Sequence, residues 1–322
     1  MIWKTPTRFV LHNLGGLPFL RWKNQDKFGI LTFHAFSASN RANLDILCTH
    51  IASHFEPLTL SQVTNSLKSS AALPKKTITV TVDDGYKSFL EYGLPVFRKH
   101  RLPVTLNIVS GFADARFWLW FDQIEFALQQ TPKSLLQITL DGQSVEFPLE
   151  SSLARVSASA MLKEALKVVP NSVRKEFVAN LGAICGVDIP LKPPEHLAGM
   201  NWEDLRSVVA EGIEIGCHTD SHPVLSRVSD PVELTREIDG AKRLIEEHLG
   251  LTVQHFCYPN GRDIDISELA IRKVVEAGYE SATTGICGFN DSSSDRFRLK
   301  RIAFDPGVGL LYGAELLAGL HM

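Results

Sequence analysis

Residues 77–86 read TITVTVDDGY, a run rich in β-branched residues that leads directly into two aspartates and a glycine. β-branched residues favour strands, and a strand without polar alternation is typical of a parallel sheet buried on both faces. Two neighbouring carboxylates at the end of such a strand repel each other unless a positive charge lies beside them, and with such a charge the two can have different roles. A metal ion can do so, with one carboxylate as its ligand and the other free to take a proton from water. A plain Asp-Asp-Gly turn is the alternative.

Strand and helix patterns alternate on both sides of this segment, which predicts repeated β–α units. Further strands are expected at residues 29–33, 104–109, 213–217, 254–258, 281–284 and 299–303. The stretch 112–200 departs from this rhythm, because helical patterns there flank a hairpin signal at Asp141-Gly142. We therefore predict an α/β fold, a parallel (β/α) barrel in a single domain 1–322 with a mainly helical insertion at 112–200. Polar residues that follow the strands of such a barrel converge on one face.

A second polar cluster, His218-Thr219-Asp220-Ser221-His222, directly follows the strand expected at 213–217. Histidines four residues apart present two imidazoles to one ion if the segment forms a helical turn, although two surface histidines in a loop would look the same. Together with one aspartate they complete a three-ligand site with an open position for water. The same set fits the facial triad of iron oxygenases. A hydrolase, however, has a use for the spare aspartate as a base, and an oxygenase has none that is evident.

These motifs resemble those of the polysaccharide deacetylase family, also known as the NodB-homology domain or carbohydrate esterase family 4. The family's T-F-D-D-G-Y motif is similar to Thr81–Tyr86, and its H-[ST]-x-x-H motif is similar to His218–His222. The resemblance implies a distorted (β/α) barrel that removes N-acetyl, or sometimes O-acetyl, groups from an amino-sugar-containing oligo- or polysaccharide. It implies that Asp83 is the catalytic base. It also implies a divalent metal, commonly Zn²⁺, with the ligands Asp84, His218 and His222.

The third family motif, R-x-P-Y-G, aligns with residues 257–261, where cysteine and asparagine replace the arginine and the tyrosine. In the family this loop gives a main-chain N–H to the oxyanion, and Asn260 can still do so because the donor belongs to the backbone. The missing arginine normally orients the base. Arg301 or Arg298, at the last expected strand, is our candidate to replace it.

The last family motif, L-x-H, falls near Leu299-Lys300-Arg301, which contains no histidine. The usual general acid is therefore absent from its place. His34 ends the strand expected at 29–33, and we predict that it protonates the leaving amine instead. A structural or substrate-contact histidine is the alternative reading of the same residue.

Composition narrows the range of partners. The net charge of −3 and the lack of a long lysine or arginine run argue against nucleic acid. Five cysteines without a C-x-x-C pair argue against a disulfide framework and favour a reducing compartment. No apolar stretch is long enough to predict a transmembrane segment, and the N-terminus lacks the pattern of a secretory signal. We therefore expect a cytoplasmic protein whose residues 9–20 pack on the core or touch a membrane surface.

The prediction from sequence is thus a metal-dependent deacetylase whose partner is an acetylated saccharide. Two rival functions stay open. One is an amidohydrolase that acts on a non-saccharide amide with the same metal site, and the other is a non-catalytic saccharide-binding relative. The aromatic run at residues 117–121 is either a sugar-stacking wall or core packing of the inserted helix.

Overall fold

The computed structural model describes residues 16–140, 142–307 and 309–320. Most of the arm predicted at residues 9–20 lies outside these ranges, and its end begins helix α2 (Gly16–Lys23). In the described part of the chain, seven parallel strands close into a ring in the order β1-β10-β9-β8-β7-β4-β3, and β3 pairs with β1. The strands are β1 (Gly29–Phe33), β3 (Thr77–Val82), β4 (Val104–Ile108), β7 (Glu214–Cys217), β8 (His255–Cys257), β9 (Ser281–Cys287) and β10 (Leu299–Ala303). The predicted (β/α) barrel is confirmed.

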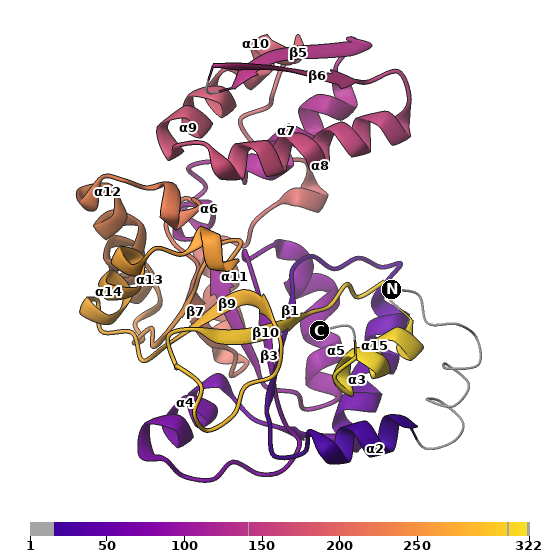
Figure 1. Cartoon of the computed structure of the whole chain (residues 1–322), viewed down its shortest axis with the longest axis vertical. Helices are drawn as coiled ribbons and strands as arrows, with labels where there is room; N and C mark the ends of the chain where they lie inside the picture. The colour runs from indigo at the N-terminus through magenta and orange to yellow at the C-terminus, as the bar shows by residue number, and fades with distance from the viewer. Residues whose placement is uncertain (1–15, 141, 308, 321–322) are drawn as a thin grey trace.

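Helices between consecutive strands surround this ring (Figure 1). They are α3 (Arg41–His54), α4 (Leu60–Ser69), α5 (Leu94–Lys99), α11 (Trp202–Ala210), α12 (Pro231–Thr235), α13 (Ala241–Leu249) and α14 (Glu268–Glu276). Local sequence fixes their ends. Thr59 and Gln62 form a capping box at the start of α4, and Gly250 ends α13 in the left-handed conformation. A short strand, β2 (Glu56–Pro57), pairs with the start of β3, and α15 (Leu310–Leu317) packs against α3.

A separate set of elements lies between β4 and β7 in the chain and extends away from the ring (Figure 1). We call residues 120–185 the lobe. It consists of α7 (Trp120–Gln130), β5 (Leu135–Leu140), β6 (Gln143–Pro148), α8 (Ser152–Val168), α9 (Asn171–Ala179) and α10 (Leu181–Cys185). Buried and exposed residues alternate along β5, so the hairpin covers the helices with one face. The lobe has its own hydrophobic core, which includes Ile124, Leu136 and Leu162.

None of the helices in the described part of the chain combines the length and the apolar character that crossing a membrane would require.

The separate core of the lobe generates a stability prediction. Leu162 is fully buried there, so Leu162→Ala should lower the free energy of unfolding of the lobe by about 2–5 kcal/mol. The next residue, Met161, is 57% exposed, and Met161→Ala is the matched control with little expected effect. Native-state hydrogen exchange read peptide by peptide should show faster exchange in the lobe and unchanged exchange in the barrel strands. Equal acceleration in both parts would contradict a separate core.

Candidate active site

The residues predicted for the site come together at the carboxyl ends of the barrel strands. They line one cavity of about 580 Å³, whose barrel side includes His34, Asp83, Asp84, His218, His222, Asn260 and Arg301. All of them except Arg301 follow a strand: His34 follows β1, the aspartates follow β3, the histidine motif follows β7 and Asn260 follows β8, whereas Arg301 lies within β10. The opposite wall comes from the lobe. The geometry that the motifs required is therefore present.

Asp84 and the two histidines of the second motif form a compact, buried group. Asp84 Oδ1 lies 3.7 Å from Nε2 of His218 and 3.5 Å from Nε2 of His222. This carboxylate oxygen is buried and has no hydrogen-bond partner among the described residues. Burial raises the pKa of Asp84 to about 7 and holds the pKa of His222 well below its usual value. One carboxylate oxygen facing two imidazole nitrogens fits a divalent cation, which would satisfy the oxygen and favour its ionised form.

The two histidines are oriented by the backbone around them. His218 Nδ1 lies 2.8 Å from the carbonyl oxygen of Cys257, which leaves Nε2 directed at Asp84. The carbonyl oxygen of His222 accepts hydrogen bonds from Trp120 Nε1 at 3.1 Å and from Arg174 Nη1 at 3.2 Å. Both donors belong to the lobe. The lobe therefore holds the main chain at His222, while Nδ1 of its ring has no hydrogen-bond partner among the described residues.

The histidine motif does not form the helical turn that we considered as a way to bring its two imidazoles together. Thr219 and His222 both have positive φ, at 70° and 55°, so the segment is an irregular loop. The hydroxyl of Thr219 accepts a hydrogen bond from the main-chain N–H of His222 at 3.0 Å, which closes the loop locally. Glu237 accepts further hydrogen bonds from Ser221. The spacing of four residues brings the imidazoles together through this loop instead of a helix.

Asp83 lies beside the same cavity but faces different partners. Arg301 Nη1 is 2.7 and 2.9 Å from its two carboxylate oxygens, and Asn107 Nδ2 donates to it at 2.8 Å. Burial alone would raise the pKa of Asp83. The charge of Arg301, followed by those of His218 and His34 and the Asn107 hydrogen bond, brings the pKa below its usual range. Asp83 is therefore held as a carboxylate.

Of the two arginines that we considered as partners for Asp83, only Arg301 is in place. Arg298 instead pairs with Asp263 and Glu268 on the outside of the barrel. Cys257, which occupies the family's usual arginine position, lies with its Sγ 3.6 Å from Asp83. The guanidinium thus reaches the aspartate from β10, while the position on β8 holds a small side chain.

A second group of potential ligands consists of Asp83, His218 and Cys257. It fits a cation less well than the first group. Burial raises the pKa of the Cys257 thiol far above its usual value, so the thiol is protonated, and Asp83 is already paired with Arg301.

The loop after β8 has the shape that an oxyanion donor needs. Asn260 has a φ of 60°, and its main-chain N–H has no acceptor among the described residues. Gly261 follows with a φ of 71°, and a Cβ there would lie 2.3 Å from the nitrogen of Gly285. Glycine is therefore required at this point for the loop to pack against β9.

His34 lies at the mouth of the cavity. Its side chain is 53% exposed, and its Nε2 is 3.8 Å from Asp83. Partial withdrawal of the ring from bulk water lowers the pKa of His34, although the charge of Asp83 opposes this shift. The ring is thus placed beside the reacting groups, and its role as an acid stays a prediction.

Our sequence reasoning missed the lobe's share of the site. Helix α8 lines the cavity with four residues at helical spacing: Ala160, Lys163, Glu164 and Lys167. Their i, i+3, i+4, i+7 spacing was the available signal, since it places them on one face. Of the aromatic run, Trp118 and Trp120 are buried, and Phe121 lines the cavity with its ring 5.1 Å from that of His222.

The chain is similar to known proteins both in part of its sequence and in its fold. Residues 193–282, which include the histidine motif, match the model of the family described as polysaccharide deacetylase. No curated protein matches the chain in sequence. Among solved structures, the Streptococcus pyogenes deacetylase PplD in complex with acetate has 15% identity and a TM-score of 0.57, over 88% of this chain and 95% of that one.

Two further structures have the same fold. IcaB from Ammonifex degensii has 15% identity and a TM-score of 0.57, over 91% of this chain and 97% of that one. The BpsB deacetylase domain from Bordetella bronchiseptica has 16% identity and a TM-score of 0.54, over 86% and 96%. The barrel is therefore of the NodB type, and the resemblance that we predicted to the polysaccharide deacetylases is confirmed. The family match over residues 193–282 supports the expected class of enzyme, a hydrolase that acts on carbon–nitrogen bonds other than peptide bonds.

The hydrogen bond from Trp120 to the carbonyl of His222 generates a prediction about metal affinity. Trp120→Phe removes the donor and should weaken Zn²⁺ binding by about tenfold, because groups that orient a ligand tune its affinity. Trp118→Phe is the matched control, since Trp118 is also buried but donates no hydrogen bond to this loop in the described structure. Competition with a chelating dye measures both affinities. Equal losses of Zn²⁺ affinity in the two variants would show that changed packing, and not the hydrogen bond, weakens binding.

Proposed function

We propose that the chain is a metal-dependent deacetylase that hydrolyses N-acetyl groups, and secondarily O-acetyl groups, of an amino-sugar-containing oligo- or polysaccharide. One observation carries the proposal: Asp83 is held ionised by Arg301 directly beside the group of Asp84, His218 and His222. The family match supports the reaction class, and the names of the similar structures, which are deacetylases, support acetyl groups as the target.

Asp84, His218 and His222 would hold the cation, and Zn²⁺ suits this ligand set. When bound, such a cation supplies Lewis-acid activation of water and of the acyl oxygen. Asp83 accepts the proton of the attacking water as the new carbon–oxygen bond forms, while Arg301 keeps its carboxylate in place. The main-chain N–H of Asn260 donates to the oxygen on which negative charge develops. His34 gives a proton to the amine nitrogen as the carbon–nitrogen bond breaks, and acetate leaves.

The role of Asp83 as base gives the first functional prediction. Asp83→Asn should reduce acetate release from N-acetylated chitooligosaccharides by about 10²–10⁴-fold, because the acceptor of the proton is lost. The metal content of the variant should equal that of the wild type, since Asp83 is not among the proposed ligands. Acetate release is measured alongside a panel of linear and cyclic amides. Turnover of the amides alone would favour the rival amidohydrolase, and metal binding without any turnover would favour a non-catalytic relative.

The ion pair between Arg301 and Asp83 gives a prediction about pH. Arg301→Met removes the main charge that lowers the pKa of Asp83, so the pKa rises and a smaller fraction is ionised at low pH. The acid limb of the kcat/KM profile should therefore move to higher pH. Arg298→Met is the matched control, because Arg298 lies three residues away and pairs with Asp263 and Glu268 instead. An unchanged acid limb in Arg301→Met would show that the ionisation of Asp83 does not determine the acid limb of the kcat/KM profile.

A further inference from the structure

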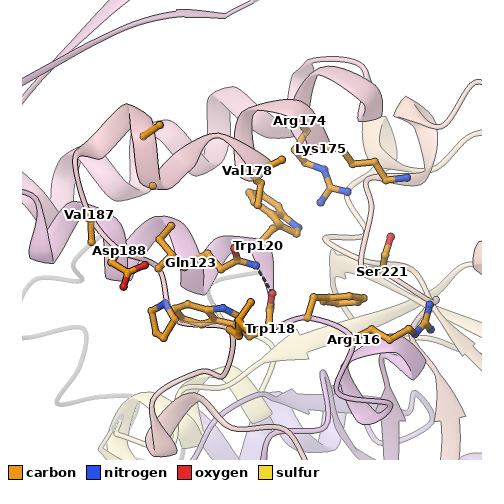
Figure 2. Close-up of a pocket in the computed structure, with 17 residues that line it drawn as sticks. Arg116, Trp118, Trp120, Gln123, Arg174, Lys175, Val178, Val187, Asp188 and Ser221 are labelled. Atoms are coloured by element: carbon orange, nitrogen blue, oxygen red, sulfur yellow. Dashed lines mark hydrogen bonds between the residues drawn. The ribbon is translucent and has the colours of Figure 1, made fainter.

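A second cavity, of about 630 Å³, lies between the lobe and the histidine loop (Figure 2). Trp120 and Gln123 of α7, Arg174 and Val178 of α9 and Ser221 of the loop contribute to its lining. No lining residue is shared with the first cavity. The two are neighbours, however, because Trp120 and Ser221 directly precede Phe121 and His222, which line the first cavity. Its volume is in the usual range for small-molecule sites.

The decisive feature of this cavity is the side chain of Arg174. It is 4% exposed, and Figure 2 shows its guanidinium directed into the cavity. Nε and Nη2 donate to Asn171 Oδ1 at 3.1 and 2.6 Å, and Nη1 donates to the carbonyl oxygen of His222 at 3.2 Å. Both acceptors are uncharged. In the described part of the chain, no carboxylate lies within ion-pair distance of Arg174. Glu237 and Glu233 act on it only from farther away, where their charges raise its pKa, so the guanidinium has no direct counter-ion.

The other cations at this cavity are already neutralised. Arg116 pairs with Asp114 and Asp220, and Lys175 pairs with Glu233. Burial lowers the pKa of Arg174 to about 10, so the guanidinium stays charged near neutral pH. Leaving a buried charge uncompensated is costly, and an anion in the cavity would offset that cost.

The guanidinium also has donors to spare. It carries five N–H groups, and three hydrogen bonds are accounted for by Asn171 and His222. Apart from Gln123 and the carboxylate of Asp188, the rest of the wall is largely apolar. The ring of Trp120 lies 5.0 Å from the guanidinium carbon, and Val178, Val187 and Ile189 line the same cavity. A ligand that matches this wall has an acidic group at one end and an apolar or sugar body at the other.

We propose that this second cavity binds an organic anion, whose carboxylate or phosphate accepts the free N–H groups of Arg174 while its body lies against Trp120 and Val178. The site is distinct from the proposed metal centre and does not depend on the deacetylase assignment. It is linked to that centre, because the same guanidinium holds the carbonyl of His222. An anion bound at Arg174 would therefore contact the guanidinium that holds the main chain of His222, a proposed metal ligand.

The test uses two fluorescent probes with the same body. 1-Anilinonaphthalene-8-sulfonate carries an acidic group, and N-phenyl-1-naphthylamine lacks it. We expect saturable binding of the sulfonate to the wild type and a loss of about tenfold or more in Arg174→Met, since hydrogen bonds to charged groups are strong. The neutral probe should bind both proteins alike. Lys175→Met is the matched control, with sulfonate binding close to that of the wild type, because Lys175 is occupied by Glu233.

A second variant covers the case in which Arg174→Met does not fold. Ala179 is an exposed residue of α9 that lines the cavity, so Ala179→Phe should fill the space and weaken both probes while Arg174 stays in place. The proposal is overturned if the sulfonate fails to bind the wild type, or binds folded Arg174→Met or Ala179→Phe as tightly as the wild type. Equal losses of both probes in Arg174→Met would also overturn it, because the charge would then play no part.

Displacement of the bound sulfonate probe by competitors identifies which acidic group and which body the cavity prefers. Glucuronate tests a carboxylate on a sugar, glucose 1-phosphate tests a phosphate on a sugar, decanoate tests a carboxylate on an alkyl chain, and glucose is the uncharged reference. Displacement by at least one acid, but not by glucose, supports the proposal and identifies its chemistry. Displacement by glucose as effectively as by every acid would overturn it.

Discussion

The site depends on the burial of two adjacent carboxylates at the end of one strand. Asp83 and Asp84 are both almost fully buried, so neither can rely on water to stabilise a negative charge. The backbone separates them, because Asp84 has a φ of 73° and turns its side chain toward the histidines. Asp83 is left to face Arg301. Each carboxylate therefore needs its own positive partner. Among the described residues, Asp83 has one in Arg301, whereas Asp84 faces two imidazoles.

Closure of the barrel is what delivers that partner. Strand β1 lies between β10 and β3, with Leu31 paired to Ile302 on one side and to Val80 on the other. Arg301 can therefore cross from β10 over β1, where it donates to Thr32, and reach Asp83 at the end of β3. In an open sheet, β10 and β3 would lie at opposite edges. The replacement of the family's arginine by Cys257 is tolerable because a guanidinium arrives from the other direction.

The sequence predicted the barrel and the residues that meet in its cavity because both have local sequence patterns. Buried parallel strands have a distinctive composition, and the carboxylate and histidine motifs stand directly after two of them. The choice between Arg298 and Arg301 could not be made in this way. It depends on where β10 begins and on the irregular register between β10 and β9 at Leu299 and Arg301, which follow from packing. The conformation of the histidine loop could not be predicted for a similar reason, since a spacing of four is typical of helices, whereas here a local hydrogen bond to Thr219 closes an irregular loop.

The lobe's contribution to the site was the least predictable part, although chain connectivity explains its position. It leaves the barrel after β4 and returns before β7, and these two strands are neighbours in the ring. It is therefore held close to the loop that follows β7, which carries both histidines. Trp120 and Arg174 use this proximity to hold the carbonyl of His222, and α8 covers the cavity from above. We therefore expect a change in the lobe's packing to alter the position of the His222 main chain, so the lobe supports the proposed metal centre as well as forming one wall of its cavity.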